Sequence, residues 1–118
     1  MPDLDHLCAR LFDAFVAHDL DTVEGLLADG ATITQNGNAM SWSEARPMLA
    51  AITDVVRNHR YEDVRRVVGD RAVVEEHVVI AESPSGRPLS LAACVVVRVD
   101  DDGLITTIDE YVDVPDLS

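Results

Sequence analysis

The run AVVEEHVVIAE at residues 72–82 has the two-residue period and the β-branched residues of a strand. Similar runs lie on both sides of it, at residues 60–68, 88–99 and 104–113, with a shorter one near 31–36. Tight turns separate the four long runs, at Gly69-Asp70, Ser83-Pro84-Ser85-Gly86 and Asp102-Gly103. Four strands joined in this order predict an antiparallel meander over the second half of the chain.

Upstream of this meander, the apolar spacing changes to the three- and four-residue steps of helices. The first predicted helix starts near Asp3 and buries one face, formed by Leu4, Leu7, Cys8, Leu11, Phe12 and Phe15. In the second helix, Asp21 and Glu24 have the spacing of a capping box. A third covers residues 43–58, with Pro47 in a tight or irregular first turn. Helices collected ahead of a meander predict an α+β fold.

The two longest strand runs, 72–82 and 88–99, exceed the usual strand length of about five or six residues, which predicts a bent sheet. Residues 92–97 are apolar at every position, as in a strand that is covered on both faces. One face would meet the core and the helices. The other would meet a second copy of the chain, so we expect a homodimer.

The composition predicts one folded domain over residues 1–118, because 47% of the residues are hydrophobic and 26% are charged. The chain carries 22 acidic and 9 basic residues, a net charge of −13, and every basic residue is arginine. Such a field repels phosphate backbones and anionic lipids, so we expect no nucleic-acid and no membrane partner. The first residues lack the basic start of a signal peptide, which predicts a cytoplasmic protein.

The sequence lacks the common signatures of cofactor and metal sites. It has no glycine-rich phosphate loop, no paired-cysteine zinc spacing, no HExxH and no GxSxG motif. The four histidines fall on separate predicted elements, at His6, His18, His59 and His77. We therefore expect neither a metal nor a cofactor. Cys8 and Cys94 lie far apart in apolar surroundings, which favours two small buried side chains over a disulfide.

Glu110 is the first candidate for chemistry. It alternates with Ile108 and Val112 in the last predicted strand, so the three side chains share one face, and we expect that face to point inward. Apolar surroundings favour the neutral form of a carboxyl group and make it a candidate general base. The structural alternative is that Glu110 pairs with Arg98 or another arginine, or reaches water at the rim of the sheet.

His77 is the second candidate, because a histidine that faces the same cavity would complete an acid–base couple. Alternatively, it is a partly exposed histidine on a charged strand. Gln35 and Asn36 offer amides that can hold a water or polarise a carbonyl, but Gln35-Asn36-Gly37-Asn38 is also a good turn sequence. Trp42 and Tyr61 could line a pocket or could be ordinary packed aromatics.

Three segments together resemble the SnoaL-like branch of the nuclear-transport-factor-2-like superfamily. They are Asp19-Leu20-Asp21, LLADGATI at residues 26–33, and GLITTIDEYVD at residues 103–113. The order of helices and strands around them is also similar, over nearly the whole chain. The resemblance implies a conical α+β barrel in which a strongly curved sheet wraps three helices around a pocket. It also implies dimerisation through the outer face of the sheet.

The family's reactions carry over to this sequence only in part. At the positions of the ketosteroid isomerase base and oxyanion hole the chain has Gln35, Leu11 and Val95, which cannot move the proton. The resemblance to limonene epoxide hydrolases places a water-positioning amide at Asn36, a base at Glu110 and a bridging group at His77. The tyrosine of that site is replaced by Thr34, and its acid falls at Val79. SnoaL-like cyclases use a histidine and a carboxylate, which His77 and Glu110 could reproduce.

Two functional hypotheses follow. In the first, a small hydrophobic molecule binds in a pocket, and Glu110 and His77 catalyse cyclisation, isomerisation or hydrolysis without a cofactor. The apolar residues expected to line the pocket are Leu11, Phe15, Trp42, Tyr61, Val95 and Ile108. In the second hypothesis, the chain is a non-catalytic ligand-binding or dimerisation module with a degenerate active site.

Overall fold

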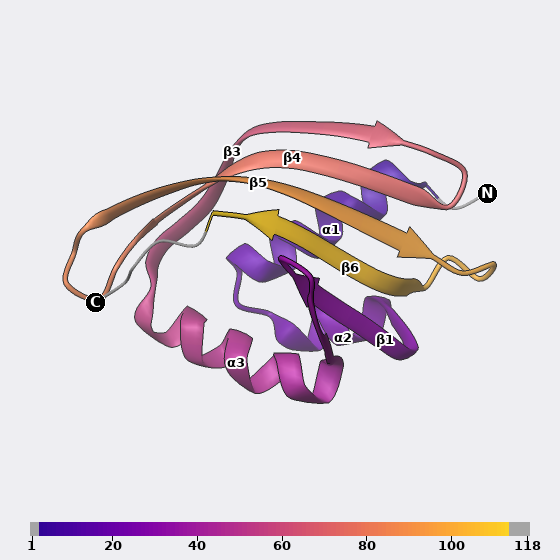
Figure 1. The fold of residues 1–118 in the computed structure, drawn as a ribbon, viewed down its shortest axis with the longest axis horizontal. Coiled ribbons are helices and arrows are strands. Elements are labelled where there is room, and N and C mark those ends of the chain that lie inside the picture. Colours follow the sequence, from indigo (N-terminus) through magenta and orange to yellow (C-terminus); the bar gives the residue numbers. More distant parts are fainter. Residues whose placement is uncertain (1–2, 114–118) are drawn as a thin grey trace.

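The computed structural model describes residues 3–113, and in this range three helices pack on a six-stranded sheet (Figure 1). The helices are α1 (Leu4–Val16), α2 (Leu20–Leu26) and α3 (Trp42–Val55). The strands are β1 (Leu27–Gln35), β2 (Asn38–Ser41), β3 (Arg57–Val68), β4 (Ala72–Glu82), β5 (Pro88–Val99) and β6 (Ile105–Val112). The predicted α+β class is confirmed.

The sheet has the strand order β2-β1-β6-β5-β4-β3. Strands β3 to β6 form the predicted antiparallel meander, and β4 and β5 have the bounds that the sequence predicted. The first strand is longer than the run predicted near residues 31–36, since it starts at Leu27. It pairs with β6 in parallel, and this pairing was not predicted. The turn at residues 36–37 is confirmed and connects β1 to β2.

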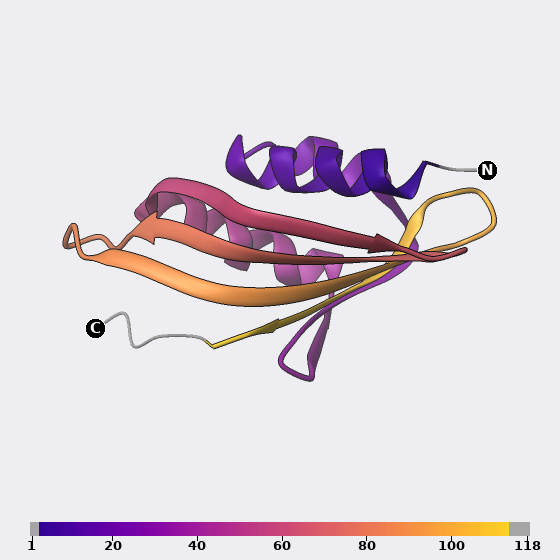
Figure 2. The same cartoon turned by 90° about the horizontal axis from the view of Figure 1, so that it is seen from above.

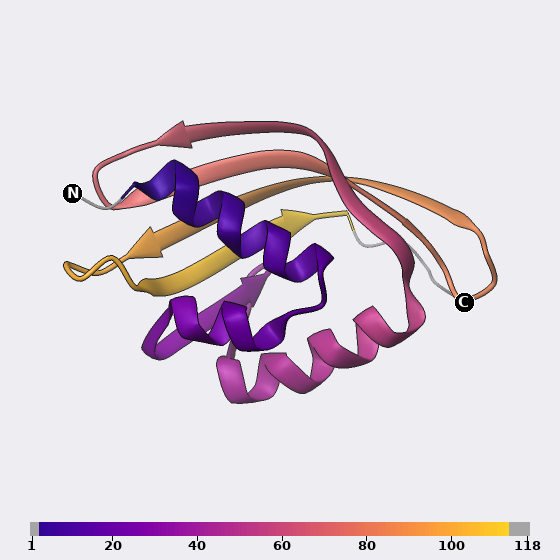
Figure 3. The ribbon, with the colours of Figure 1, turned by 180° about the vertical axis from the view of Figure 1, so that it is seen from behind.

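The sheet curls into an open cone, and α1 lies on its concave face (Figure 3). Helix α3 runs from the β2 edge of the sheet to the start of β3, so it spans the opening between the two edges (Figure 1). The convex face carries no helix from the described residues (Figure 2). The curvature therefore leaves one enclosed side, where a site can form, and one bare side.

Side chains at the helix starts explain why the helices begin where they do. Helix α1 starts beside Asp3, as predicted, and the side chain of Asp3 caps it by accepting a hydrogen bond from the backbone N–H of His6. The predicted cap of α2 at Asp21 is wrong, because Asp19 holds that position and accepts from the backbone of Thr22. At α3 a capping box forms between Ser41 and Glu44.

Helix α3 also differs from the prediction at Pro47. The sequence predicted this proline near a tight or irregular first turn, but it lies inside a continuous helix of 14 residues. A proline at this depth removes one backbone hydrogen bond without ending the helix.

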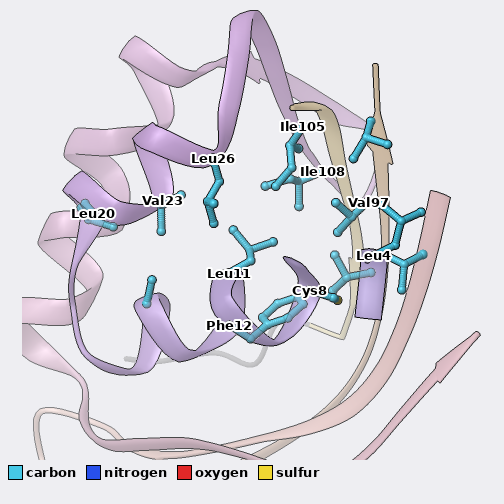
Figure 4. Close-up of a cluster of buried hydrophobic side chains, with 14 residues drawn as sticks. Leu4, Cys8, Leu11, Phe12, Leu20, Val23, Leu26, Val97, Ile105 and Ile108 are labelled. Atoms are coloured by element: carbon cyan, nitrogen blue, oxygen red, sulfur yellow. The ribbon is translucent and has the colours of Figure 1, made fainter. Parts of the chain in front are cut away.

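The core lies between the inner face of α1, helix α2 and the strands β4 to β6 (Figure 4). The predicted apolar face of α1 is buried at Leu4, Cys8, Leu11 and Phe12, while Leu7 and Phe15 are partly buried at its margin. Burial of a leucine or phenylalanine contributes about 1.5 to 3 kcal/mol, so this face holds α1 on the sheet. None of the described helices is long and apolar enough to cross a membrane.

Both cysteines are free thiols. Cys8 is buried in the core, and burial, together with the negative charge of Glu75, raises the pKa of its thiol to about 12. Cys94 is only half-buried, on the convex face of β5.

Candidate functional site

A cavity of about 250 Å³ lies between the C-terminal end of α1, helix α3 and the concave side of the sheet, with lining residues from all six strands. This volume is a little below the roughly 300–1,000 Å³ typical of sites for small molecules. Most of its wall is apolar, with side chains from α3 and from the curled ends of the strands: Met48, Leu49, Ile52, Val79, Leu89 and Leu91. An occupant of this cavity would be small and largely apolar.

Glu110 lines this cavity together with Ile108 and Val112, on the face that strand alternation predicted. Its carboxylate Oε1 accepts a hydrogen bond from Gln35 Nε2 at 2.9 Å. The parallel pairing of β1 with β6 creates this contact, because it places Gln35 directly beside Glu110. Arg98 does not reach Glu110, since it pairs with Asp109 on the other face of β6. The ion-pair alternative with Arg98 is therefore wrong.

His77 does not line the cavity, because the rings of Phe12 and Tyr61 pack against its imidazole, with centroids 5.0 and 4.3 Å away. Val95 on β5 lies between Glu75 on β4 and Glu110 on β6, so these strands are separated by two strand spacings, roughly 9–10 Å. His77 lies two residues further along β4, where it is 3% exposed. The two predicted catalytic residues thus share the concave face but do not meet in one cavity.

His77 belongs to a buried polar network beside the cavity. Its Nδ1 lies 2.5 Å from Glu75 Oε2, and Arg66 Nε donates to Glu75 Oε1 at 2.7 Å. Glu75 is fully buried, and Nε2 of His77 has no hydrogen-bond partner among the described residues. An irregularity of β3 around Asp63, at φ +54°, shifts the alternation and turns Arg66 toward Glu75.

Tyr61 connects this network to the cavity. Its ring lies over the His77 ring, with centroids 4.3 Å apart, and it also lines the cavity. Burial raises the pKa of Tyr61, and the negative charges of Glu110 and Glu75 raise it further. The phenol therefore stays protonated near neutral pH and can donate a hydrogen bond.

Two histidines that the sequence did not single out, His18 and His59, line the cavity. Burial lowers the pKa of His59, and positive charge on His18 and His77 lowers it further. The sequence signal for His59 is its two-residue spacing from Tyr61. The predicted strand started at residue 60 and therefore left His59 out. In the structure β3 starts earlier, but its first residues are irregular: Asn58 has a φ of +54°, and the pairing with β4 shifts register before Arg60.

The other predicted site residues divide into two groups. Gln35, Phe15, Tyr61, Val95 and Ile108 line the cavity. The remaining three lie outside its lining: Leu11 is fully buried in the core, Trp42 donates its indole N–H to Glu24, and Asn36 binds the backbone of Val112.

The cavity presents acid–base groups but no set of metal ligands. Within residues 3–113, no three histidine, cysteine, aspartate or glutamate side chains come close enough to hold a metal ion. The polar groups of the lining are a carboxylate, two imidazoles, a phenol, an amide and two threonine hydroxyls. They can exchange protons and donate hydrogen bonds.

Comparisons with known proteins agree with this architecture. A family model described as a SnoaL-like domain matches residues 8–108. A comparison with curated proteins gives no match. Among solved structures, a candidate SnoaL-like polyketide cyclase from Shewanella denitrificans is similar, with a TM-score of 0.84 and 12% identity. The likeness covers 96% of this chain and 92% of that one.

Two other solved structures have the same fold. An NTF2-like protein of unknown function from Burkholderia pseudomallei has a TM-score of 0.83 and 17% identity, over 96% of this chain and 92% of that one. An LEH-like epoxide hydrolase from M. tuberculosis has a TM-score of 0.76 and 22% identity, over 92% and 80% of the chains. At these identities the likeness shows the fold alone.

Proposed function

Because the chain belongs to the family of SnoaL-like domains, we propose that it binds a small, largely apolar molecule in this cavity and acts on it as a cofactor-independent acid–base enzyme. Glu110 is the general base. One observation carries this proposal: the carboxylate of Glu110 lines an apolar cavity, held by a neutral amide and by no arginine.

In the proposed reaction, Gln35 fixes one carboxylate oxygen of Glu110, and the other oxygen takes a proton from the substrate or from a water. Tyr61, or the ring N–H of His59, donates a hydrogen bond to the oxygen on which negative charge develops. Isomerisation, cyclisation and hydrolysis all begin with such a step. His77 then acts as a positioning residue, because it holds Tyr61 from behind and does not line the cavity.

A general-base probe tests this role without knowledge of the natural substrate. A base removes the C3 proton of 5-nitrobenzisoxazole, the ring N–O bond breaks, and a coloured cyanophenolate forms. We expect Glu110→Gln to lower the rate constant by about 100-fold or more, as for loss of a positioned general base. Asp109→Asn is the matched control, because it changes the neighbouring carboxylate on the opposite face of β6.

The proposal fails if Glu110→Gln reacts as fast as the wild type, or if the wild type is no faster than free acetate at equal concentration. It also fails if His59→Gln abolishes the reaction while Glu110→Gln does not, since the base is then a histidine. Circular dichroism of each variant shows whether the fold is retained.

We also propose that the chain forms a homodimer through the convex face of the sheet. This face carries apolar side chains, including Val74, Val78 and Val96, beside the ion pairs Arg65–Glu76 and Arg98–Asp109. A protein that forms the dimer but does not turn over the probe would be a non-catalytic binding or dimerisation module, which is the second candidate function.

A further inference from the structure

We propose that the natural ligand of the cavity is a small organic cation, a protonated or quaternary amine with apolar substituents. This inference rests on the proposed function in one respect, that the cavity is the binding site. It goes beyond that function by assigning the charge of the ligand.

The first argument is the charge of the cavity. Glu110 is the only carboxylate among the described residues that line it, and none of these residues is an arginine. The arginine that faces inward, Arg66, is already bound to Glu75 and Asp5. Glu110 is half-buried among mostly apolar side chains, where a nearby positive charge stabilises a carboxylate. A cation in the cavity would supply that counter-charge.

The neutral polar groups of the cavity do not supply it. Gln35 donates one hydrogen bond from an uncharged amide. His59 favours its neutral form at pH 7.5, because burial lowers its pKa, and the phenol of Tyr61 is also neutral there. His18, which lines the cavity as well, is exposed to solvent. A cationic ligand would therefore meet one negative group and no arginine.

The second argument is the aromatic lining. Phe12, Phe15 and Tyr61 all line the cavity, and the centroid of Phe12 lies 6.0 Å from that of Phe15 and 5.2 Å from that of Tyr61. Aromatic faces attract organic cations within about 6 Å of the ring centroid. Met48, Leu49 and Ile52 contribute apolar surface for the substituents of the ligand. The net charge of −13 also attracts cations toward the protein.

A pair of isosteres separates charge from shape. Choline and 3,3-dimethyl-1-butanol differ chiefly in a positive nitrogen against a neutral carbon. We expect choline to bind at least tenfold more tightly at pH 7.5, measured by NMR titration, with shifts at Tyr61 and His59. Glu110→Gln should bring the ratio of the two dissociation constants close to one. Asp109→Asn should leave the ratio unchanged.

Equal affinity of the wild type for the two probes overturns the inference and leaves the proposed function standing, because the cavity would still bind ligands. A choline preference that persists in Glu110→Gln also overturns it, since the cation would then sit elsewhere on the acidic surface. If neither probe binds, the inference fails, and the benzisoxazole assay decides separately on the proposed function. The comparison of the two probes on the wild-type protein tests the inference even if the Glu110→Gln variant does not fold.

Discussion

At the scale of single residues, the fold holds His59 in its neutral form, and this predicts how stability depends on pH. The unfolded chain protonates His59 near pH 6.5, but the folded protein resists this, because burial lowers the pKa. Below about pH 6.5 the unfolded state therefore binds more protons, and the free energy of unfolding falls as the pH falls. His59→Phe should reduce this fall, as measured by urea denaturation between pH 8 and pH 5.

The wild-type profile is the control, because the two proteins share every other titrating group. Electrostatic repulsion from His18 contributes to the lowered pKa of His59, so a repeat in His18→Gln tests that contribution. Two pH profiles of the same shape for wild type and His59→Phe would contradict the prediction.

The orientation of Glu110 could be predicted from the sequence, and the surroundings of His77 could not. Period-two alternation on the regular strand β6 was enough to place Glu110 with Ile108 and Val112. The polar network around His77 includes Arg66, which reaches Glu75 because β3 is irregular around Asp63. One extra residue in a strand reverses every later side chain, and a local pattern does not show on which strand it will occur.

At the scale of elements, Asn36 ties the end of β1 to the end of β6. Its side chain donates to the backbone oxygen of Val112 at 2.7 Å and accepts from the backbone N–H at 2.9 Å. Asn36→Gly keeps the backbone at φ +50° accessible and removes both bonds. We expect a loss of about 1 kcal/mol in the free energy of unfolding, because the bonds are exposed.

Asn36→Ala is the companion variant. It removes the same two bonds and adds the cost of a left-handed backbone conformation, about 1 kcal/mol more. Urea denaturation should therefore rank wild type above Asn36→Gly and Asn36→Ala lowest. An alanine variant as stable as the glycine variant would mean that the turn relaxes, and that the tie to β6 does not depend on this conformation.

The sequence predicted the meander better than it predicted the strands around Asn36. Hairpins are local, and residues 69–70 and 102–103 mark two of them directly. The pairing of β1 with β6 joins Gln35 to Glu110 across 75 positions, and no turn residue indicates it. The contact that holds the proposed base was therefore visible only in the folded structure.

At the scale of the whole molecule, the convex face of the sheet is the surface with no helix from the described residues. Val74 lies opposite Val96 and beside Val67, which is 73% exposed. Exposed apolar surface of this kind is characteristic of interfaces. We expect the wild type to sediment as a dimer, and Val74→Arg to sediment as a monomer. Val55→Arg on α3 is the control, an exposed valine outside the sheet that should leave the dimer intact.

Cysteine reactivity gives an independent reading of the same interface. Cys94 lies on the convex face, two residues from Val96, whereas Cys8 is buried and its thiol pKa is raised to about 12. Only the thiolate reacts quickly with a disulfide reagent, so Cys8 should stay silent in the folded protein. Cys94 should react slowly in the dimer and faster in Val74→Arg. Fast labelling of Cys94 in a wild type that sediments as a dimer would place the interface elsewhere.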